Sequence, residues 1–277
     1  MLAIAALALS ACGGSGSGLG TITIHSAHTY HVSGFGPTKG IRPGVPTLMH
    51  FTIVKPDGKP LTQYREGKGP HTGADLVIVR SDDSHVLYID TTNHPSGLIS
   101  QRVTFPAPGR YRVVIDAYPK SGTTLAPSNF QLFEWVTVAG TPRLSPVPPY
   151  TGSEVVDGYR FSIQGKPALH AIAPGTITFH VTDRAGRPAH FQLWRGALAH
   201  AIFIRKGNLV YFHTHVCPPG ANYCSSRLGG LRVTGVSSTP GVLKVGVLAP
   251  VPGVYRLFLL TYIAGRERVA PFTVTVK

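Results

Sequence analysis

Three histidines in the second half of the sequence are the side chains best suited to hold a metal ion. His213-Thr214-His215 lies on a predicted strand, where alternation places both imidazoles on one face, about 7 Å apart. His200 lies on the strand predicted just before it. Three neutral imidazoles that converge and leave one position open suit Cu(II) or Zn(II), so the sequence predicts a metal site at His200, His213 and His215.

The turn between these two strands decides whether His200 joins the other two. The dipeptide Gly207-Asn208 is favoured in two-residue hairpin turns. With that turn, His200 lies directly opposite His215 and diagonal to His213, and all three project from one face. A three-residue turn would shift the register by one residue and move His200 to the other face.

Two alternatives to this site stay open. The histidines could be sheet residues satisfied by backbone and hydroxyl partners, without metal. Cys217 has the same strand parity as His215 and offers a thiolate ligand instead. A second candidate metal site consists of His25, His28 and His31. Their spacing of three residues places them on alternating faces of an extended chain, so they would not converge without a turn.

Composition and charge limit the classes of function. The chain has 26 Lys and Arg against 12 Asp and Glu, a formal charge of +14, and its basic residues are scattered. Such a surface suits anionic envelope polymers or an envelope protein, and we expect no nucleic-acid partner. A nucleophile elbow and a phosphate-binding glycine loop are missing, and acidic residues are few, so we expect no enzyme.

The N-terminus resembles a bacterial lipoprotein signal. An apolar stretch leads into Leu9-Ser10-Ala11-Cys12, which is similar to the lipobox, although the first basic residue is Lys39. This resemblance implies a signal peptide at 1–11, lipid on Cys12, and anchoring to the outer side of the bacterial cell membrane. Residues 12–24 hold the lipidated cysteine and a Gly/Ser tether. The remaining pair, Cys217 and Cys224, is expected to form a disulfide in an exported protein.

The rest of the chain is an internal repeat of short strands and Gly/Pro turns. The chain is 43% hydrophobic and has 32 Gly and 24 Pro, which argues for an all-β protein. Pro108-Gly109 and Pro252-Gly253 introduce matching strands, and a tyrosine two residues after each Gly is similar to a tyrosine corner. We predict two tandem immunoglobulin-like β-sandwich domains, at 25–140 and 155–277, joined by a Pro-rich linker at 141–154.

The two copies differ at the candidate site. Alignment of the copies places Asp75, Asp90 and Thr92 of the first where the second has His200, His213 and His215. The first copy is therefore expected to have lost or changed any metal-binding function.

Three segments of the second copy resemble a known group of exported proteins. They are GALAHAIFIR (196–205), YFHTH (211–215) and VPGVYR (251–256). The pattern is similar to YtkA-like and copper-resistance-type heavy-metal-binding β-sandwich proteins, although Val216-Cys217 stands where that group usually has a proline after His-x-His. The resemblance implies a lipid-anchored envelope protein that binds or buffers a transition metal, copper first. The alternative is a structural or interaction module of the envelope without metal.

Overall fold

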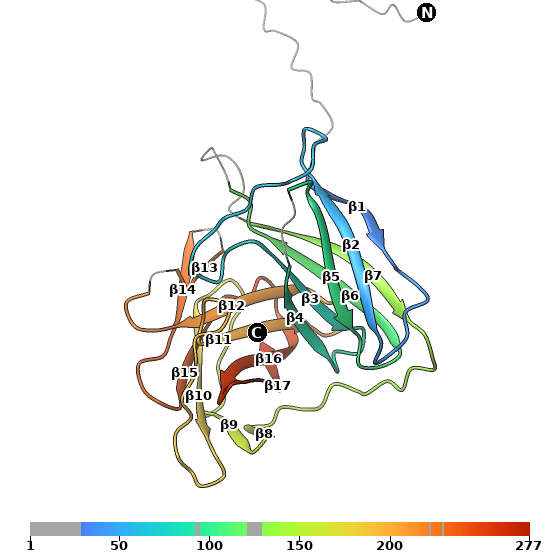
Figure 1. Ribbon diagram of the computed structural model, residues 1–277. Coiled ribbons are helices and arrows are strands. Elements are labelled where there is room, and N and C mark those ends of the chain that lie inside the picture. Colours follow the sequence, from blue (N-terminus) through green and yellow to red (C-terminus); the bar gives the residue numbers. More distant parts are fainter. Residues whose placement is uncertain (1–28, 92–94, 121–128, 222, 229) are drawn as a thin grey trace, which may run out of the picture.

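The computed structural model describes residues 29–91, 95–120, 129–221, 223–228 and 230–277. Within these ranges the chain forms seventeen β-strands and no helix (Figure 1). The chain is therefore all-β, as predicted. The expected signal peptide, Cys12, the tether, His25, His28 and Thr92 lie outside the described residues.

The first half is a sandwich of two antiparallel sheets. One sheet has the order β1-β2-β5, formed by β1 (His31–Gly36), β2 (Pro46–Val54) and β5 (Leu98–Thr104). The other has the order β4-β3-β6-β7, formed by β4 (Val86–Asp90), β3 (Ala74–Arg80), β6 (Gly109–Ala117) and β7 (Phe130–Val138). Alternate residues of β2 (Met49, Phe51 and Ile53) point into the core between the sheets. This is the immunoglobulin-like arrangement expected from the alternating pattern.

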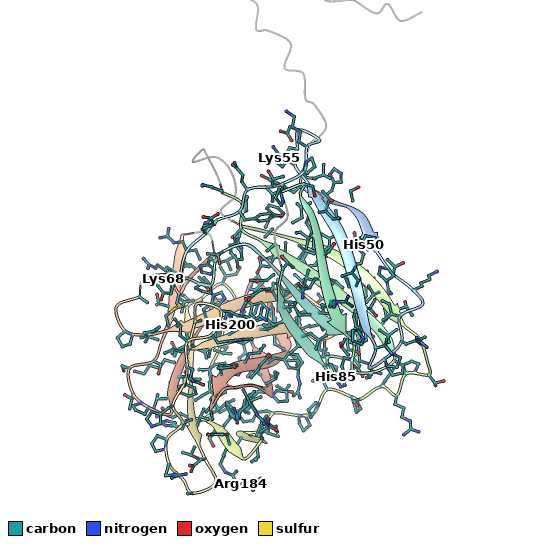
Figure 2. All side chains as sticks on the ribbon, in the orientation of Figure 1. His50, Lys55, Lys68, His85, Arg184 and His200 are labelled. Carbon is teal, nitrogen blue, oxygen red and sulfur yellow. A yellow bond between two sulfur atoms is a disulfide. The ribbon has the colours of Figure 1, made fainter. Side chains whose placement is uncertain are left out.

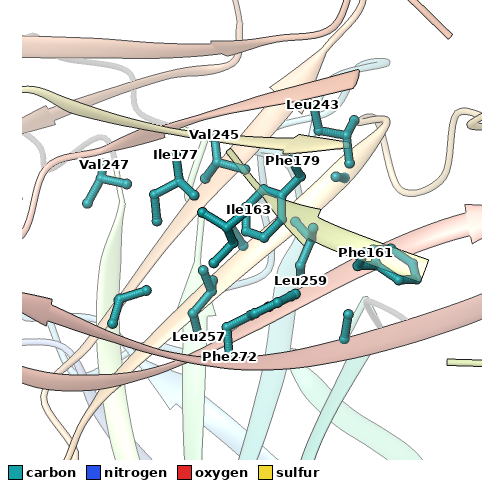
Figure 3. Close-up of a cluster of buried hydrophobic side chains, with 14 of the residues drawn as sticks. Phe161, Ile163, Ile177, Phe179, Leu243, Val245, Val247, Leu257, Leu259 and Phe272 are labelled. Carbon is teal, nitrogen blue, oxygen red and sulfur yellow. The ribbon is translucent and has the colours of Figure 1, made fainter. Parts of the chain in front are cut away.

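The second half is built on one long sheet that folds back on itself. Its strands are β8 (Ser153–Val156), β9 (Tyr159–Ile163), β10 (Gly175–Thr182), β11 (Ala199–Arg205), β12 (Tyr211–Cys217), β13 (Ser225–Leu228), β14 (Leu231–Val236), β15 (Val242–Val247), β16 (Gly253–Ile263) and β17 (Arg266–Val276). The order is β17-β16-β11-β12-β14-β15-β10-β9-β8, with β13 beside β14. Phe179 and Val245 pack against Leu257 and Phe272 from the opposite layer (Figure 3). A short parallel pairing of β12 with β14 joins the two layers.

The two halves repeat the same local devices. The Tyr111 hydroxyl donates to the carbonyl of Ala107 (2.9 Å), and the Tyr255 hydroxyl donates to that of Val251 (2.7 Å), so both tyrosine corners form. Arg80 and Arg205 each donate from Nε to the carbonyl of the proline before the matching glycine. These equivalent contacts confirm an internal repeat.

The halves meet through an apolar interface between the β3-β4-β6 face and the β11-β12-β16 face (Figure 1). The interface residues are Val77, Val79, Val86, Tyr88 and Val114 from the first half and Ile202, Ile204, Leu209, Tyr211, Phe258 and Leu260 from the second. Arg112 Nη1 adds a hydrogen bond of 2.7 Å to the carbonyl of Leu209. The extended segment between the halves is also tied to the first, because the Arg143 carbonyl accepts from Arg80. The two sandwiches are therefore packed against each other.

Candidate metal centre

The structure brings His200, His213 and His215 together on one face of the β11–β12 hairpin. His200 pairs directly with His215, as predicted. One ring nitrogen from each residue can be chosen so that all three lie within 4.8 Å of one another. The His200 Nδ1 to His213 Nε2 distance is 3.3 Å. Two imidazole nitrogens on one tetrahedral zinc are also about 3.3 Å apart, so this spacing fits a shared ion.

The predicted register is right, but the predicted turn is too short. The backbone N–H of Arg205 donates to the carbonyl of Val210, so the loop contains the four residues 206–209 and not only Gly207-Asn208. Leu209 closes this loop with φ +53°. The observed loop is longer than the predicted turn by one residue on each side, so the pairing register of the two strands is unchanged. His200 therefore stays on the face of His213 and His215.

Burial keeps these imidazoles neutral. His200 is 0% exposed and His215 is 1% exposed. Desolvation lowers the pKa of His200 to about 4, and a hydrogen bond to the Trp194 backbone offsets part of this lowering. The pKa of His213 and that of His215 are lowered well below their usual value, again chiefly by burial and then by the neighbouring imidazoles. A neutral imidazole is the form that binds a metal.

A backbone carbonyl orients the first of these histidines. His200 Nε2 lies 3.1 Å from the carbonyl oxygen of Trp194, so this nitrogen carries the proton and donates. Its Nδ1 then has a lone pair directed toward His213. Metal-bound histidines are commonly fixed by such a bond from the second nitrogen. Trp194 had no signal in the sequence, because it belongs to the preceding turn and acts through its backbone.

Three other ring nitrogens of the cluster have no partner among the described residues. They are Nδ1 of His213 and both nitrogens of His215. A buried polar atom without a partner costs about 1–3 kcal/mol. The cluster therefore combines available lone pairs with imidazole donors that suit Cu(II) and Zn(II), and its residues fit such an ion.

The first half covers the cluster with aromatic rings. Tyr88 lies 4.9 Å from the ring of His200 and 5.2 Å from that of His213, measured between centroids. Its hydroxyl donates to Oδ2 of Asp75 at 2.9 Å. Figure 2 labels His200 in the region where the two halves meet. The candidate centre is thus closed on one side by the first half.

This arrangement corrects the alignment of the copies. The Asp75–Asp90 pair in the first hairpin corresponds to the His200–His215 pair in the second. Tyr88, and not Asp90, therefore stands where the second half has His213. The alignment by sequence was shifted by two residues because it ignored the four-residue loop that both hairpins share.

Carboxyl groups near the centre are largely buried. Burial, followed by the proximity of Asp90, raises the pKa of Asp75 well above its usual value. Burial also raises the pKa of Asp116 to about 6, although the hydroxyls of Tyr118 and Tyr211 donate to it at 3.2 Å each. These groups face the interface between the halves and lie outside the set of three ligand candidates.

Two cavities give access to this region. One, of about 500 Å³, is lined by His213 together with His71, Asp116 and Tyr211. The other, of about 300 Å³, is lined by Asp75, Tyr88 and Arg195 among others. An ion can therefore approach the cluster from the side of His213.

The cysteine pair beyond His215 forms the expected disulfide. Cys217 and Cys224 are joined, with their Cα atoms 5.7 Å apart. The bond removes Cys217 from the candidate ligands. Disulfides of this kind are typical of oxidising, extracytoplasmic compartments.

Replacing both cysteines by serine is expected to lower the free energy of unfolding by about 2.5 kcal/mol, because the bond closes a loop of about eight residues in the unfolded chain. The measurement is urea unfolding of the parent and of Cys217→Ser/Cys224→Ser. The parent unfolded in the presence of a reductant is the control and should match the variant. A loss below about 0.5 kcal/mol would show that the bond does not constrain the unfolded chain.

Comparison with known proteins gives one family match. Residues 154–277 match a family described as "Domain of unknown function (DUF8832)". No curated protein matches the chain. These comparisons give no support for the resemblance to YtkA-like or copper-resistance-type proteins.

Solved structures of low similarity cover most of the chain. Fibronectin(III)-like modules of Clostridium thermocellum CbhA are 12% identical over 88% of this chain and 92% of that one, with a TM-score of 0.22. Domains 4 and 5 of the S-layer protein SbsC are 12% identical over 89% and 98%, with a TM-score of 0.23. Invasin, a bacterial integrin-binding protein, is 16% identical over 90% of this chain and 38% of its own, with a TM-score of 0.23. Scores this low carry no conclusion about function.

A search of the described residues for a membrane-spanning helix finds none.

Proposed function

We propose that this chain is a lipid-anchored protein of the bacterial cell envelope that binds or buffers a transition metal at His200, His213 and His215. The observation that carries the proposal is the convergence of three neutral imidazoles, one of them held in the ligating tautomer by the Trp194 carbonyl. We infer no catalytic role for the chain. The disulfide supports an extracytoplasmic site of action.

Copper(II) is the first candidate and zinc(II) the second. All three donors are imidazole nitrogens, which both ions accept. For a given set of nitrogen donors copper(II) binds more tightly than zinc(II). The only methionines are Met1 and Met49, and Met49 is buried in the core of the first half, so a thioether site for copper(I) is not part of the proposal.

The predicted anchor and the charge suggest where the protein would work. Lipid on Cys12 would hold the folded part at the membrane through the Gly/Ser tether. The formal charge of +14 would favour contact with anionic envelope polymers or with an envelope protein. These partners follow from the sequence and are part of the proposal.

Calorimetric titration with Cu(II) and with Zn(II) tests the function. We expect one equivalent to bind to the chain that starts after Gly18, and at least 100-fold weaker binding to His213→Ala/His215→Ala. The control is His50→Ala/His180→Ala, which removes two exposed strand histidines and should leave the site intact. Equal binding by all three proteins, or none by the parent, would overturn the proposal and favour an interaction module without metal.

A further inference from the structure

A fourth imidazole contacts the cluster from the other half of the molecule. His71 belongs to the connection between β2 and β3. Its ring centroid lies 4.7 Å from that of His215, with the rings nearly perpendicular. The three cluster rings are separated from one another by 4.2 to 5.3 Å. His71 is therefore as close to His215 as the cluster members are to each other.

His71 has the chemistry of a ligand. A neutral imidazole carries one N–H donor and one lone pair, so a ring that donates from one nitrogen can bind a metal through the other. One of its nitrogens donates a hydrogen bond to the backbone of Tyr223. The other nitrogen keeps its lone pair. This repeats the arrangement of His200 and the Trp194 carbonyl, in which a backbone acceptor fixes the tautomer.

Two segments of the second half hold the chain around His71. A Cβ on Gly196 would lie 2.4 Å from the carbonyl carbon of Gly69, so the two backbones are in close contact there. A Cβ on Gly69 would lie 3.1 Å from the ring of Tyr223, so this ring also packs against Gly69. Tyr223 precedes Cys224 of the disulfide. Gly196 belongs to the same turn as Trp194, whose carbonyl orients His200. The position of His71 is thus set by the same segments that frame the cluster.

We propose that His71 is the fourth protein ligand of the metal centre, so that the bound ion joins the two halves of the molecule. This inference rests on the proposed function. His71 lies outside the set of three residues whose nitrogens are within 4.8 Å of one another, so ligation requires its free nitrogen to move toward the other three. Four imidazole ligands make a closed site, which is typical of structural or storage roles, whereas catalytic sites keep a position for water.

The test counts nitrogen ligands in the full chain loaded with Cu(II) or Zn(II). Electron paramagnetic resonance of the copper form and X-ray absorption of the zinc form should give four imidazole nitrogens in the parent and three in His71→Ala. We expect His71→Ala to bind 10- to 100-fold more weakly. Free imidazole should restore the fourth nitrogen, because the cavity of about 500 Å³ is lined by His71. His50→Ala, at an exposed strand position, is the control.

The outcomes separate this inference from the proposed function. If the parent binds and His71→Ala keeps the same ligand count and affinity, His71 is not a ligand, while the three-histidine site stands. If the parent binds no metal, both proposals fail. If His71→Ala does not fold, His71→Gln supplies the comparison, since it keeps a polar side chain of similar reach. An unchanged ligand count in His71→Gln would overturn the inference.

Discussion

Replacing His215 by leucine is expected to stabilise the metal-free chain while it abolishes metal binding. His215 is 1% exposed, and neither of its ring nitrogens has a partner among the described residues. A neutral imidazole must carry one N–H, and leaving that donor buried and unpaired costs about 1–3 kcal/mol. Leucine has a similar volume and no polar atom. The free energy of unfolding should therefore rise by about 1–3 kcal/mol at pH 8.

The gain from this substitution should grow as the pH falls. The pKa of His215 is lowered in the folded chain, so below about 6.5 the unfolded chain binds a proton that the folded chain does not. This difference destabilises the parent by about 1.4 kcal/mol at pH 5.5, and it is absent at pH 8. Asp116, whose pKa is raised, acts in the opposite direction over this range. It is present in both proteins and cancels in the comparison.

Urea unfolding at pH 8 and pH 5.5, without metal, measures both effects. Thr214→Val is a matched control from the same strand, because Thr214 is also buried with an unpaired hydroxyl. The control should keep metal binding, and its effect on the free energy of unfolding should not change with pH. Loss of stability in His215→Leu at both pH values would mean that the imidazole has partners in the folded chain, and that its burial is no sign of a ligand.

Alternation and turn parity were enough to predict that the three histidines share a face. That prediction needed only the strand period and an even number of loop residues, and it survived an error in loop length. Alignment of the two copies also depended on the loop length. There the error shifted the alignment by two residues and matched Asp90 with His213 instead of His215. The alignment already matched Arg80 with Arg205, and counting the same four loop residues after each arginine would have matched Asp90 with His215.

The surface that faces the cluster could not be predicted in this way. Strand alternation says which side chains share a face, but it does not say what packs on that face. Tyr88 and His71 reach the cluster only because the two sandwiches pack against each other, and His71 comes from a segment without strand periodicity. The continuous sheet of the second half was missed for a related reason. Its β12–β14 pairing joins segments separated by the disulfide loop, and nothing local specifies it.

Gly196→Ala is expected to lower the free energy of unfolding by more than the cost of an alanine at positive φ, because it also disturbs the contact between the halves. Gly196 has φ +75° in the tight turn between Trp194 and Ala197. A Cβ there would lie 2.4 to 2.8 Å from the backbone of Gly69 and Pro70. Backbone atoms cannot move aside as a flexible side chain can, so one of the two segments must shift. We expect about 1–3 kcal/mol of destabilisation beyond the conformational cost.

Gly186→Ala separates the two contributions. Gly186 has φ +78°, nearly the same as Gly196, but a Cβ there would meet nothing within 4 Å. It should therefore show the cost of a positive φ alone, about 1–2 kcal/mol. Because Trp194 orients His200, Gly196→Ala should also weaken metal binding by about 10- to 100-fold, while Gly186→Ala leaves it unchanged. Equal effects of the two substitutions on urea unfolding would mean that the halves separate easily at Gly69, and that the segment carrying His71 is not held against the cluster.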